Sequence, residues 1–467
     1  MKRKSNSQSE SSGDPLRVLE VFDSLEVGPV KLTNKKLSMP YKLHYKKQSD
    51  STELIYSYEE DVFDPTDPAA INLANMIGAQ VALNYGLFCK KIIFRGNYDN
   101  ADKRFIQDMM ENTAREIYVL KFLEPNPFLI GKAKNLPVVK RQKYCRSQIE
   151  FPDSKSKTCK TSWGIGSESN RYCILSSGGK DSLLSYGLLN ELGKETHPIF
   201  VNESGRHWFT ALNSYRYFRE NIPNTARVWA NSDRLFNWMI RHMPFIRKDY
   251  SRIRADEYPI RLWTVAVFLF GVLPLMRKRG IGRLIIGDEY DTSEKTSYKG
   301  ITHYSGLYDQ SRYFDEAMSR YYKSKGWDVS QFSILRPLSE IMIQNILVKR
   351  YPDLQKQQIS CHAAHQVENR IFPCGKCEKC RRIVGILKAM AADPANCGYD
   401  EKQIVHCLKE IASKPIHQES LGAEHLNYTL KEKGLIITLI PLHRQSCCRR
   451  QQCMAMSERS VLSFPGL

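Results

Sequence analysis

The chain has 467 residues, of which 42% are hydrophobic and 25% charged, so it is long enough for two domains with ordinary buried cores. Its formal net charge of +19 favours a nucleotide, an acidic small molecule or RNA as partner, although evenly spread basic residues also suit a generally basic surface. The 13 cysteines are odd in number and scattered, which argues against a secreted disulfide framework.

The longest apolar run covers residues 262–276, between Arg261 and Arg277. Because a membrane span needs about 18 or more apolar residues, this run predicts a buried helix. The first residues, "MKRKSNSQSESSGD", are polar and lack the apolar core of a signal peptide. The sequence therefore predicts a cytoplasmic protein without a membrane partner.

Composition and patterning change several times along the chain, and these changes predict its domain order. We expect a disordered tail (1–14), an N-terminal α+β domain (15–135), a linker or basic loop (136–170), an α/β domain (171–345), a segment with four closely grouped cysteines and C-terminal helices (346–420) and a basic, Cys-rich tail (421–467).

From residue 171 onward, short β runs alternate with helical patterns, which predicts an α/β fold with a parallel sheet and helices on both faces. Ligands of such sheets lie at the carboxyl ends of the strands. Residues 176–182, 202–203 and 287–291 each follow a β run. We therefore expect these three segments to meet in one crevice.

The stretch "CILSSGGKDSLLSYGLLNELG", residues 173–193, joins an apolar run to a helical pattern through a loop of small residues. Ser176 and Ser177 stand where N-caps stand, and Gly178 and Gly179 allow a ligand to approach the backbone closely. A strand, a small-residue loop and a helix N-terminus form a phosphate site, although the Walker spacing is absent. The predicted nucleotide-binding set is Ser176, Ser177, Gly178, Gly179, Lys180, Asp181, Ser182, Asn202, Gly287, Asp288 and Glu289.

Residues 177–182, Ser-Gly-Gly-Lys-Asp-Ser, resemble the signature of the PP-loop (N-type ATP pyrophosphatase) superfamily. The resemblance implies a Rossmann-like, adenine-nucleotide α-hydrolase-like sheet and an enzyme that splits ATP into AMP and pyrophosphate. It implies that Lys180 neutralises the pyrophosphate, that Asp181 organises Mg²⁺ or the loop, and that Ser177 and Ser182 donate to phosphate oxygens. The alternative is a tight strand–helix turn with a chance lysine.

The segment "RADEYPIRLWTVAVFLFGVLPLMRKRGIGRLIIGDEYDTSE" is similar to a later part of the same superfamily, in which an apolar helix leads to a strand that ends in Gly and acids. By that similarity Asp288 and Glu289 are candidate contacts for Mg²⁺ or substrate. The alternative is that these acids cap the next helix.

Cys361, Cys374, Cys377 and Cys380 lie in the stretch "SCHAAHQVENRIFPCGKCEKCRR". The C-x-x-C-x-x-C spacing with a fourth upstream cysteine suits a tetrahedral Zn²⁺ site, with an iron–sulfur cluster as the rival. His362 or His365 could replace Cys361. Four thiolates leave no open position on the metal, so this spacing predicts a structural role.

A PP-loop followed by this cysteine pattern resembles the zinc-containing cyano-deazaguanine synthase family over residues 171–390. That family begins at its PP-loop, whereas about 170 residues precede the loop here, and its usual substrate segment is replaced here by "GDEYDTSEKTSYKGITHYSG". The long N-terminal part and the stretch "LRPLSE", residues 335–340, resemble the ATP-dependent UDP-N-acetylmuramoyl-L-alanyl-L-glutamate epimerase family instead.

Both resemblances imply adenylation of a substrate carboxylate, by a ligase or synthase type of enzyme or by an epimerase. In this scheme Arg336 grips the carboxylate and Glu340 acts as a base, so the expected catalytic residues are Lys180, Asp181, Arg336 and Glu340. A salt bridge at the start of a helix explains the last two residues equally well.

Two further function classes stay open. A tRNA-modifying PP-loop enzyme would suit the basic charge, but it needs a catalytic cysteine near the loop, and Cys173 falls inside a predicted strand. A non-catalytic, zinc-organised nucleotide-binding protein would not require Lys180, Asp181 and Ser182. We expect an acidic small molecule as partner, with RNA as the alternative and a homodimer as an open possibility.

Overall fold

A computed structural model describes the protein in five stretches, 13–154, 168–253, 258–304, 307–414 and 420–436. The expected N-terminal tail lies almost wholly outside the described residues, as does the part of the expected C-terminal tail beyond residue 436. Among the helices described, none combines the length and the apolar character that crossing a membrane requires.

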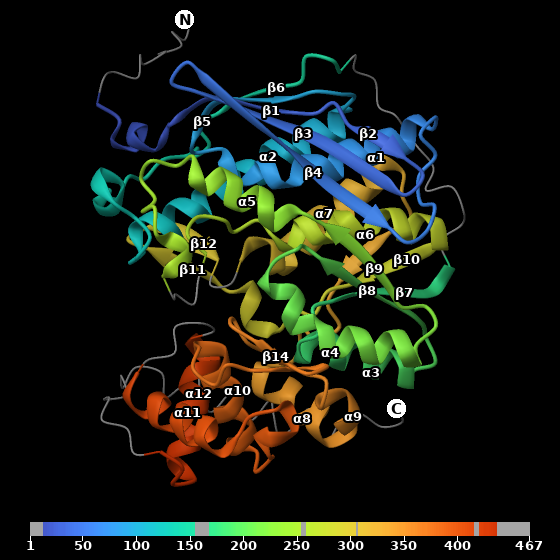
Figure 1. The fold of residues 1–467 in the computed structure, drawn as a ribbon, viewed down its shortest axis with the longest axis vertical. Coiled ribbons are helices and arrows are strands. Elements are labelled where there is room, and N and C mark those ends of the chain that lie inside the picture. The colour runs from blue at the N-terminus through green and yellow to red at the C-terminus, as the bar shows by residue number, and fades with distance from the viewer. Residues whose placement is uncertain (1–12, 155–167, 254–257, 305–306, 415–419, 437–467) are drawn as a thin grey trace, which may run out of the picture.

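One 11-stranded sheet runs through the molecule (Figure 1), in the order β13-β10-β7-β8-β9-β4-β3-β1-β5-β6, with β2 paired to β3. Its strands are β1 (Phe22–Val27), β2 (Lys31–Thr33), β3 (Lys36–Tyr45), β4 (Gln48–Tyr58), β5 (Cys89–Phe94), β6 (Gln148–Glu150), β7 (Glu168–Ser176), β8 (Glu195–Asn202), β9 (Ala226–Ala230), β10 (Ile281–Ile285) and β13 (Ser330–Phe332). Two separate hairpins are β11 (Lys295–Tyr298) with β12 (Ile301–Tyr304), and β14 (His365–Val367) with β15 (Arg370–Phe372).

The half of the sheet from β13 to β9 is parallel throughout, which agrees with the α/β architecture expected from the alternating pattern. The chain runs outward from β7 through β8 to β9 and then returns to the other side of β7 to form β10 and β13. The strand order therefore reverses between β7 and β10. In open α/β sheets a ligand binds in the crevice outside the carboxyl ends of the strands at such a switch point.

Helices connect the parallel strands and form most of the C-terminal part of the chain. They are α1 (Pro68–Ala79), α2 (Asn100–Ile117), α3 (Lys180–Glu191), α4 (Arg206–Asn221), α5 (Ser232–Arg241), α6 (Val265–Arg279), α7 (Arg312–Lys325), α8 (Glu340–Arg350), α9 (Pro352–Gln355), α10 (Glu378–Ala389), α11 (Glu401–Ser413) and α12 (Ser420–Glu432).

The apolar run at 262–276 forms α6, which is buried as expected: Leu269 and Leu273 are fully inaccessible to solvent. The carboxylate of Asp309 accepts hydrogen bonds from the backbone N–H groups of residues 264–266, at 2.8 to 3.2 Å. These are the N–H groups that the first turn of a helix leaves without a partner. A helix with no exposed face thus has its N-terminus satisfied from inside the protein.

The N-terminal strands belong to the same sheet as β7 to β10, so a separate N-terminal domain is not confirmed. β4 pairs antiparallel with β9, placing Tyr56 opposite Ala230. The hydroxyls of Tyr56 and Tyr58 donate to backbone carbonyls of α6, at 3.1 and 2.9 Å. A single hydrophobic cluster includes buried residues of both regions. The pairing with β4 also covers the edge that β9 would otherwise leave open.

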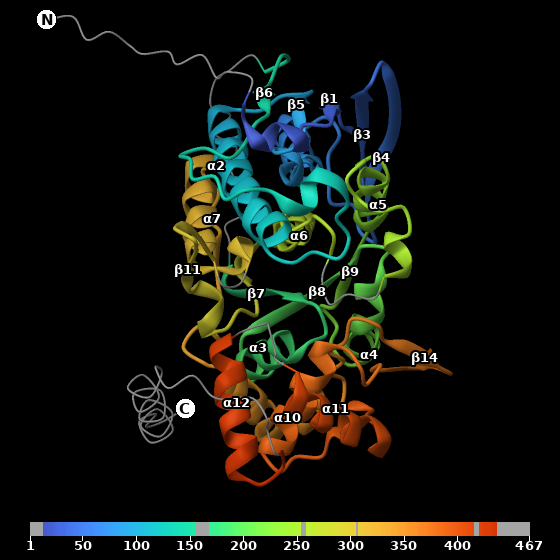
Figure 2. The ribbon, with the colours of Figure 1, turned by 90° about the vertical axis from the view of Figure 1, so that its left-hand side faces the viewer.

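The C-terminal helices α8 to α12 form a layer below α3, at the end of the molecule opposite the N-terminal strands (Figure 2). α12 packs against α8 and α10, although its residues fall in the segment expected to be an unpatterned tail. The expected linker likewise contributes β6 and the start of β7. The C-terminal layer is thus larger than the cysteine pattern alone indicates.

We expect residues 168–467 not to fold alone, because β9 would lose β4 and α6 would lose the two tyrosine hydrogen bonds. Calorimetry and far-ultraviolet circular dichroism should show a cooperative thermal transition for the full chain and none for the shorter chain. A shorter chain that melts cooperatively near the temperature of the full chain would instead establish an independent N-terminal domain.

Candidate active site and metal centre

The predicted phosphate loop lies between the end of β7 and the start of α3. Gly178 has φ of +74°, and a Cβ there would come within 2.9 Å of the Ala211 Cα, so a larger residue does not fit. The N-cap of α3 is Gly179, which has no side chain to accept from the first turn. A helix N-terminus left in this way can bind anionic oxygens. The Ser176 and Ser182 hydroxyls lie 3.2 Å apart behind the loop.

Lys180 is the centre of a buried ion network that joins three segments distant in sequence. Its Nζ lies 2.9 Å from the Asp181 carboxylate, 3.1 Å from Glu289 and 3.5 Å from Glu340. Asp181 belongs to α3, Glu289 follows β10 and Glu340 begins α8. The two loops at the switch point thus meet as the sequence predicted, and Glu340 joins them.

Burial raises the pKa of two acids near Lys180, Glu289 and Asp291. Burial raises the pKa of Glu289 to about 7, although the Lys180 ammonium beside it lowers that pKa. Burial also raises the pKa of Asp291 to about 6. Acids whose negative charge is this poorly solvated gain from a second cation, and carboxylate oxygens are the ligands that Mg²⁺ prefers. Asp181 and Glu289 could hold such an ion.

The close approach of the two loops requires Gly287. A Cβ at this position would lie 2.6 Å from the Cβ of Asp181 and 3.1 Å from the Ser182 nitrogen. Neither atom is the end of a flexible side chain, so the strand-end loop can reach the phosphate loop only with glycine here. Gly287 therefore has a steric role in the predicted nucleotide-binding set.

Arg336 is held by partners distant in sequence, and not by the local salt bridge to a residue of its own motif that was the alternative interpretation. Its Nη2 lies 3.2 Å from Asp288 Oδ2 and 2.8 Å from Asp315 Oδ2, and its Nη1 donates to the Thr292 hydroxyl. In this arrangement the guanidinium orients Asp288 and does not offer a free fork to a substrate carboxylate. Burial raises the pKa of Asp288, and Arg336 opposes this increase.

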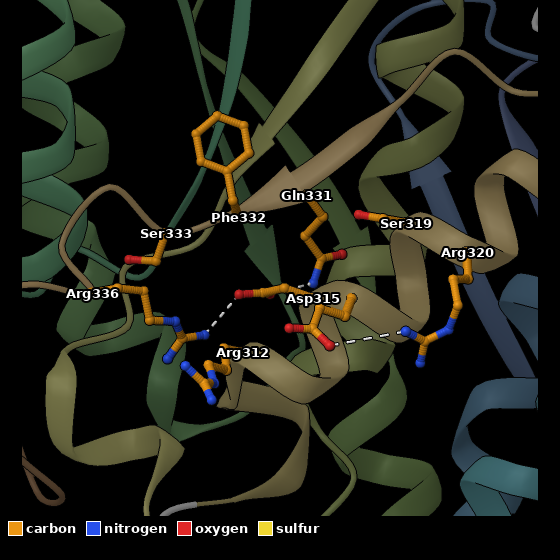
Figure 3. Close-up of a pocket in the computed structure, with 9 residues that line it drawn as sticks. Arg312, Asp315, Ser319, Arg320, Gln331, Phe332, Ser333 and Arg336 are labelled. Atoms are coloured by element: carbon orange, nitrogen blue, oxygen red, sulfur yellow. Dashed lines mark hydrogen bonds and ion pairs between the residues drawn. The ribbon is translucent and has the colours of Figure 1, made fainter.

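The Arg336 side chain also lines an open hollow of about 490 Å³ between α7 and β13 (Figure 3). Arg312 and Arg320 line the same hollow, and Arg320 lies 3.9 Å from its helix neighbour Glu316. The hollow flanks the switch-point crevice, because its Ser333 hydroxyl bonds to the backbone of Asp288.

Asn202, predicted to reach the crevice from the end of β8, makes a local contact. Its Oδ1 accepts from the Ser204 backbone N–H at 2.9 Å, in the turn that leads to α4. The next residue, Glu203, is buried and accepts from the Trp208 N–H at 3.2 Å. This segment reaches the loop indirectly, since α4 packs on Gly178. Asn202 as a nucleotide contact stays a prediction.

The four predicted metal ligands lie together, and their sulfur atoms fit a tetrahedral ion. Every pair of sulfurs is within 4.8 Å, and three pairs are 3.5, 3.8 and 3.9 Å apart. For Zn–S bonds of about 2.3 Å, the edge of the tetrahedron is about 3.8 Å. The cluster Cys361, Cys374, Cys377 and Cys380 is therefore compatible with zinc.

Backbone N–H groups surround these sulfurs as they would surround thiolates. Ala363 and Cys374 each donate to Cys361 Sγ at 3.2 Å, and Lys376 and Cys377 each donate to Cys374 Sγ at 3.4 Å. Hydrogen bonds to a charged sulfur favour the ligating form over the neutral thiol. His362 places no ring nitrogen among the four ligand atoms, so the all-cysteine set describes the site.

Sequence reasoning missed three contributors to the site. Asp315 on α7 and Thr292 after β10 hold Arg336. Arg382 on α10 lies with its Nε 3.0 Å from Glu340 Oε1. Arg382 follows the last cysteine of the motif closely enough to draw attention, but Asp315 lies in an ordinary amphipathic helix whose pattern gives no such signal.

No known protein-family profile matches the chain. A curated protein, the 7-cyano-7-deazaguanine synthase of Chlorobium luteolum, is 27% identical over 216 residues, or 45% of this chain and 88% of that protein. This similarity supports a relationship between the chain and the PP-loop superfamily. It agrees with the sheet, the SGGKDS loop and the cysteine cluster, whereas the resemblance to the epimerase family stays a prediction.

We expect Cys377→Ser to lose bound zinc and thermal stability together, because a tetrahedral thiolate site contributes directly to folding. Metal content measured by mass spectrometry should fall from one ion per chain to almost none, and the melting temperature should drop by several degrees. Cys145→Ser, outside the cluster, should change neither value. A Cys377→Ser protein that melts like the parent would remove the structural role of the metal.

Burial raises the pKa of Glu203 from 4.5 to about 7. A carboxyl with a raised folded-state pKa binds more protons when folded, so its contribution to stability is present below pH 4.5 and is lost as the pH rises through 7. Glu203→Gln removes this loss. The variant should therefore gain stability relative to the parent by about 3 kcal/mol between pH 4.5 and pH 8 in urea unfolding.

Exposed Glu220→Gln is the matched control for this measurement, and its stability should follow that of the parent at each pH. A difference between Glu203→Gln and the parent that stays constant with pH would show that Glu203 titrates normally.

Proposed function

We propose that this protein is an ATP-dependent adenylating enzyme that activates a carboxylate of an acidic small molecule and releases pyrophosphate. The observation that carries the proposal is Lys180, held at the start of α3 by acids from both sides of the switch point. The similarity to a synthase of the PP-loop superfamily supports an ATP-using enzyme of this kind.

In the proposed reaction, a carboxylate oxygen attacks the α-phosphorus of ATP, and the bond between that phosphorus and the oxygen bridging to the β-phosphate breaks. The N-terminus of α3 and Lys180 then hold the pyrophosphate as negative charge develops on it. Asp181 and Glu289 would hold Mg²⁺, which supplies further charge neutralisation at the phosphates. Arg336 orients Asp288 beside them and opposes the increase in the pKa of Asp288 that burial causes.

The zinc would be structural in this proposal, since four thiolates fill its coordination sphere. It would hold α10 and the layer of C-terminal helices against the crevice. The fate of the acyl-adenylate, whether amide, nitrile or epimer, depends on the second reactant. The similarity to a synthase favours a reaction that forms a bond to the activated carboxylate.

The rival function, tRNA thiolation, finds no support in the cysteine nearest the loop. Cys173 lies inside β7, is fully inaccessible to solvent, and burial raises the pKa of its thiol. A neutral, enclosed thiol is a poor nucleophile. RNA as a substrate is therefore an outcome that the activity assay must separate from a small molecule.

Lys180→Met should abolish release of AMP and pyrophosphate, because methionine keeps the length of the side chain but removes the charge that faces the phosphates. We expect the rate to fall at least about a hundredfold. The assay is AMP and pyrophosphate release from ATP with a small-molecule extract, with a purified tRNA pool, or with buffer alone. Lys323→Ala, on the exposed side of α7, is the control and should be as active as the parent.

Each outcome of this assay has a distinct meaning. Turnover only with the small molecules supports the proposal, whereas turnover only with tRNA moves the function to RNA modification. ADP and phosphate as products would show that the loop does not bind ATP in the proposed way. A Lys180→Met protein with normal turnover and a normal melting temperature would remove Lys180 from the mechanism.

A further inference from the structure

Glu340 lies at the junction between the phosphate loop and the metal-binding layer. It is 1% exposed, and its carboxylate has two cations beside it: Lys180 Nζ at 3.5 Å and Arg382 Nε at 3.0 Å, both measured to Oε1. Lys180 belongs to the phosphate loop, and Arg382 belongs to α10. One buried carboxylate therefore connects the two parts of the molecule.

The cysteine cluster fixes the position of Arg382. Cys377 is the N-cap of α10, Cys380 lies in its first turn, and Arg382 follows two residues later on the same helix. Arg382 is itself 6% exposed, so it has little room for other positions. A metal that holds the two cysteines holds the start of α10, and with it the guanidinium that faces Glu340.

A second C-terminal element encloses the same carboxylate. A Cβ built on Gly422 of α12 would lie 3.9 Å from Glu340 Oε2 and 3.6 Å from Asp291 Oδ2. The backbone of α12 thus lies close to both acids. Water has little access to Glu340, so its charge must be balanced by the cations nearby.

The charge balance around Lys180 gives Arg382 a role. Lys180 faces three carboxylates, those of Asp181, Glu289 and Glu340, and it must turn part of its charge toward an incoming phosphate. With Arg382 in place, Glu340 keeps a cation when Lys180 engages the ligand. Without Arg382, less positive charge would lie beside Glu340, so Glu340 would attract Lys180 more strongly and oppose its movement toward the phosphate.

We propose that Arg382 is a positioning residue that releases Lys180 for nucleotide binding by balancing Glu340, so that the state of the cysteine cluster determines affinity at the phosphate loop. This inference rests on the proposed function, because it takes ATP as the ligand of the loop. It goes further in making the metal a determinant of nucleotide affinity as well as of folding.

The test measures ATP affinity by titration calorimetry, with Mg²⁺ present, on the full-length zinc-loaded chain. Arg382→Gln should weaken ATP binding about tenfold or more while the bound zinc and the melting temperature stay close to those of the parent. Arg382→Lys, which keeps the charge, should recover most of the affinity. Arg381→Gln is the matched control, since Arg381 is buried to a similar extent on α10, whereas the ion pair with Glu340 is made by Arg382.

A double-mutant cycle separates this role from general destabilisation. Glu340→Gln removes the carboxylate that Arg382 balances, so Arg382→Gln should cost little affinity in the Glu340→Gln background. Metal removal gives a second cycle: a chelator should weaken ATP binding to the parent and should have less effect on Arg382→Gln. If Arg382→Gln folds poorly, the ATP affinities of Arg382→Lys and of the variant with both Arg382→Gln and Glu340→Gln are compared with that of the parent instead.

The outcomes distinguish this inference from the proposed function. If Arg382→Gln is folded, binds zinc and binds ATP as tightly as the parent, the inference is overturned and the proposed function is unaffected. Equal losses in Arg382→Gln and Arg381→Gln, or a loss that persists in the Glu340→Gln background, also overturn it. A parent that binds no ATP overturns both.

Discussion

The arrangement of the crevice depends on one buried ammonium group, that of Lys180. Enclosing a charge away from water is costly, and the cost is offset only when partners of opposite sign lie within a few ångströms. Here those partners come from the phosphate loop, from the end of β10 and from the start of α8. Removing one partner from such a network typically costs about 3–5 kcal/mol, so the network holds three distant segments in register.

The parallel half of the sheet makes this convergence possible. The reversal of strand order between β7 and β10 places the loops after both strands next to each other, and Gly287 lets them touch. The N-terminal strands support the same arrangement from the far side. They pair with β9 through β4, and their tyrosines bond to α6, the helix that leads into β10.

The C-terminal layer has little hydrophobic core of its own to hold its helices together. Its two hydrophobic clusters are much smaller than the core around the central sheet, and small cores rarely hold helices firmly without a further link. A metal ion bound by the four cysteines would supply that link, because metal binding and folding share one free energy. Arg382 lies on the helix that begins at this cluster and contacts Glu340, so the cluster and the crevice are joined by one ion pair.

The sequence by itself determined what contiguous residues can encode: the phosphate loop, the buried α6, the parallel α/β pattern and the four cysteines. Each depends on spacing within one segment, which local geometry sets. The tertiary structure alone decided that the N-terminal strands continue the sheet, that Arg336 faces Asp288 and Asp315, and that Arg382 faces Glu340. These contacts join residues tens to hundreds of positions apart. They form only when the chain packs, because the sequence around a charged residue does not show which distant residue will pair with it.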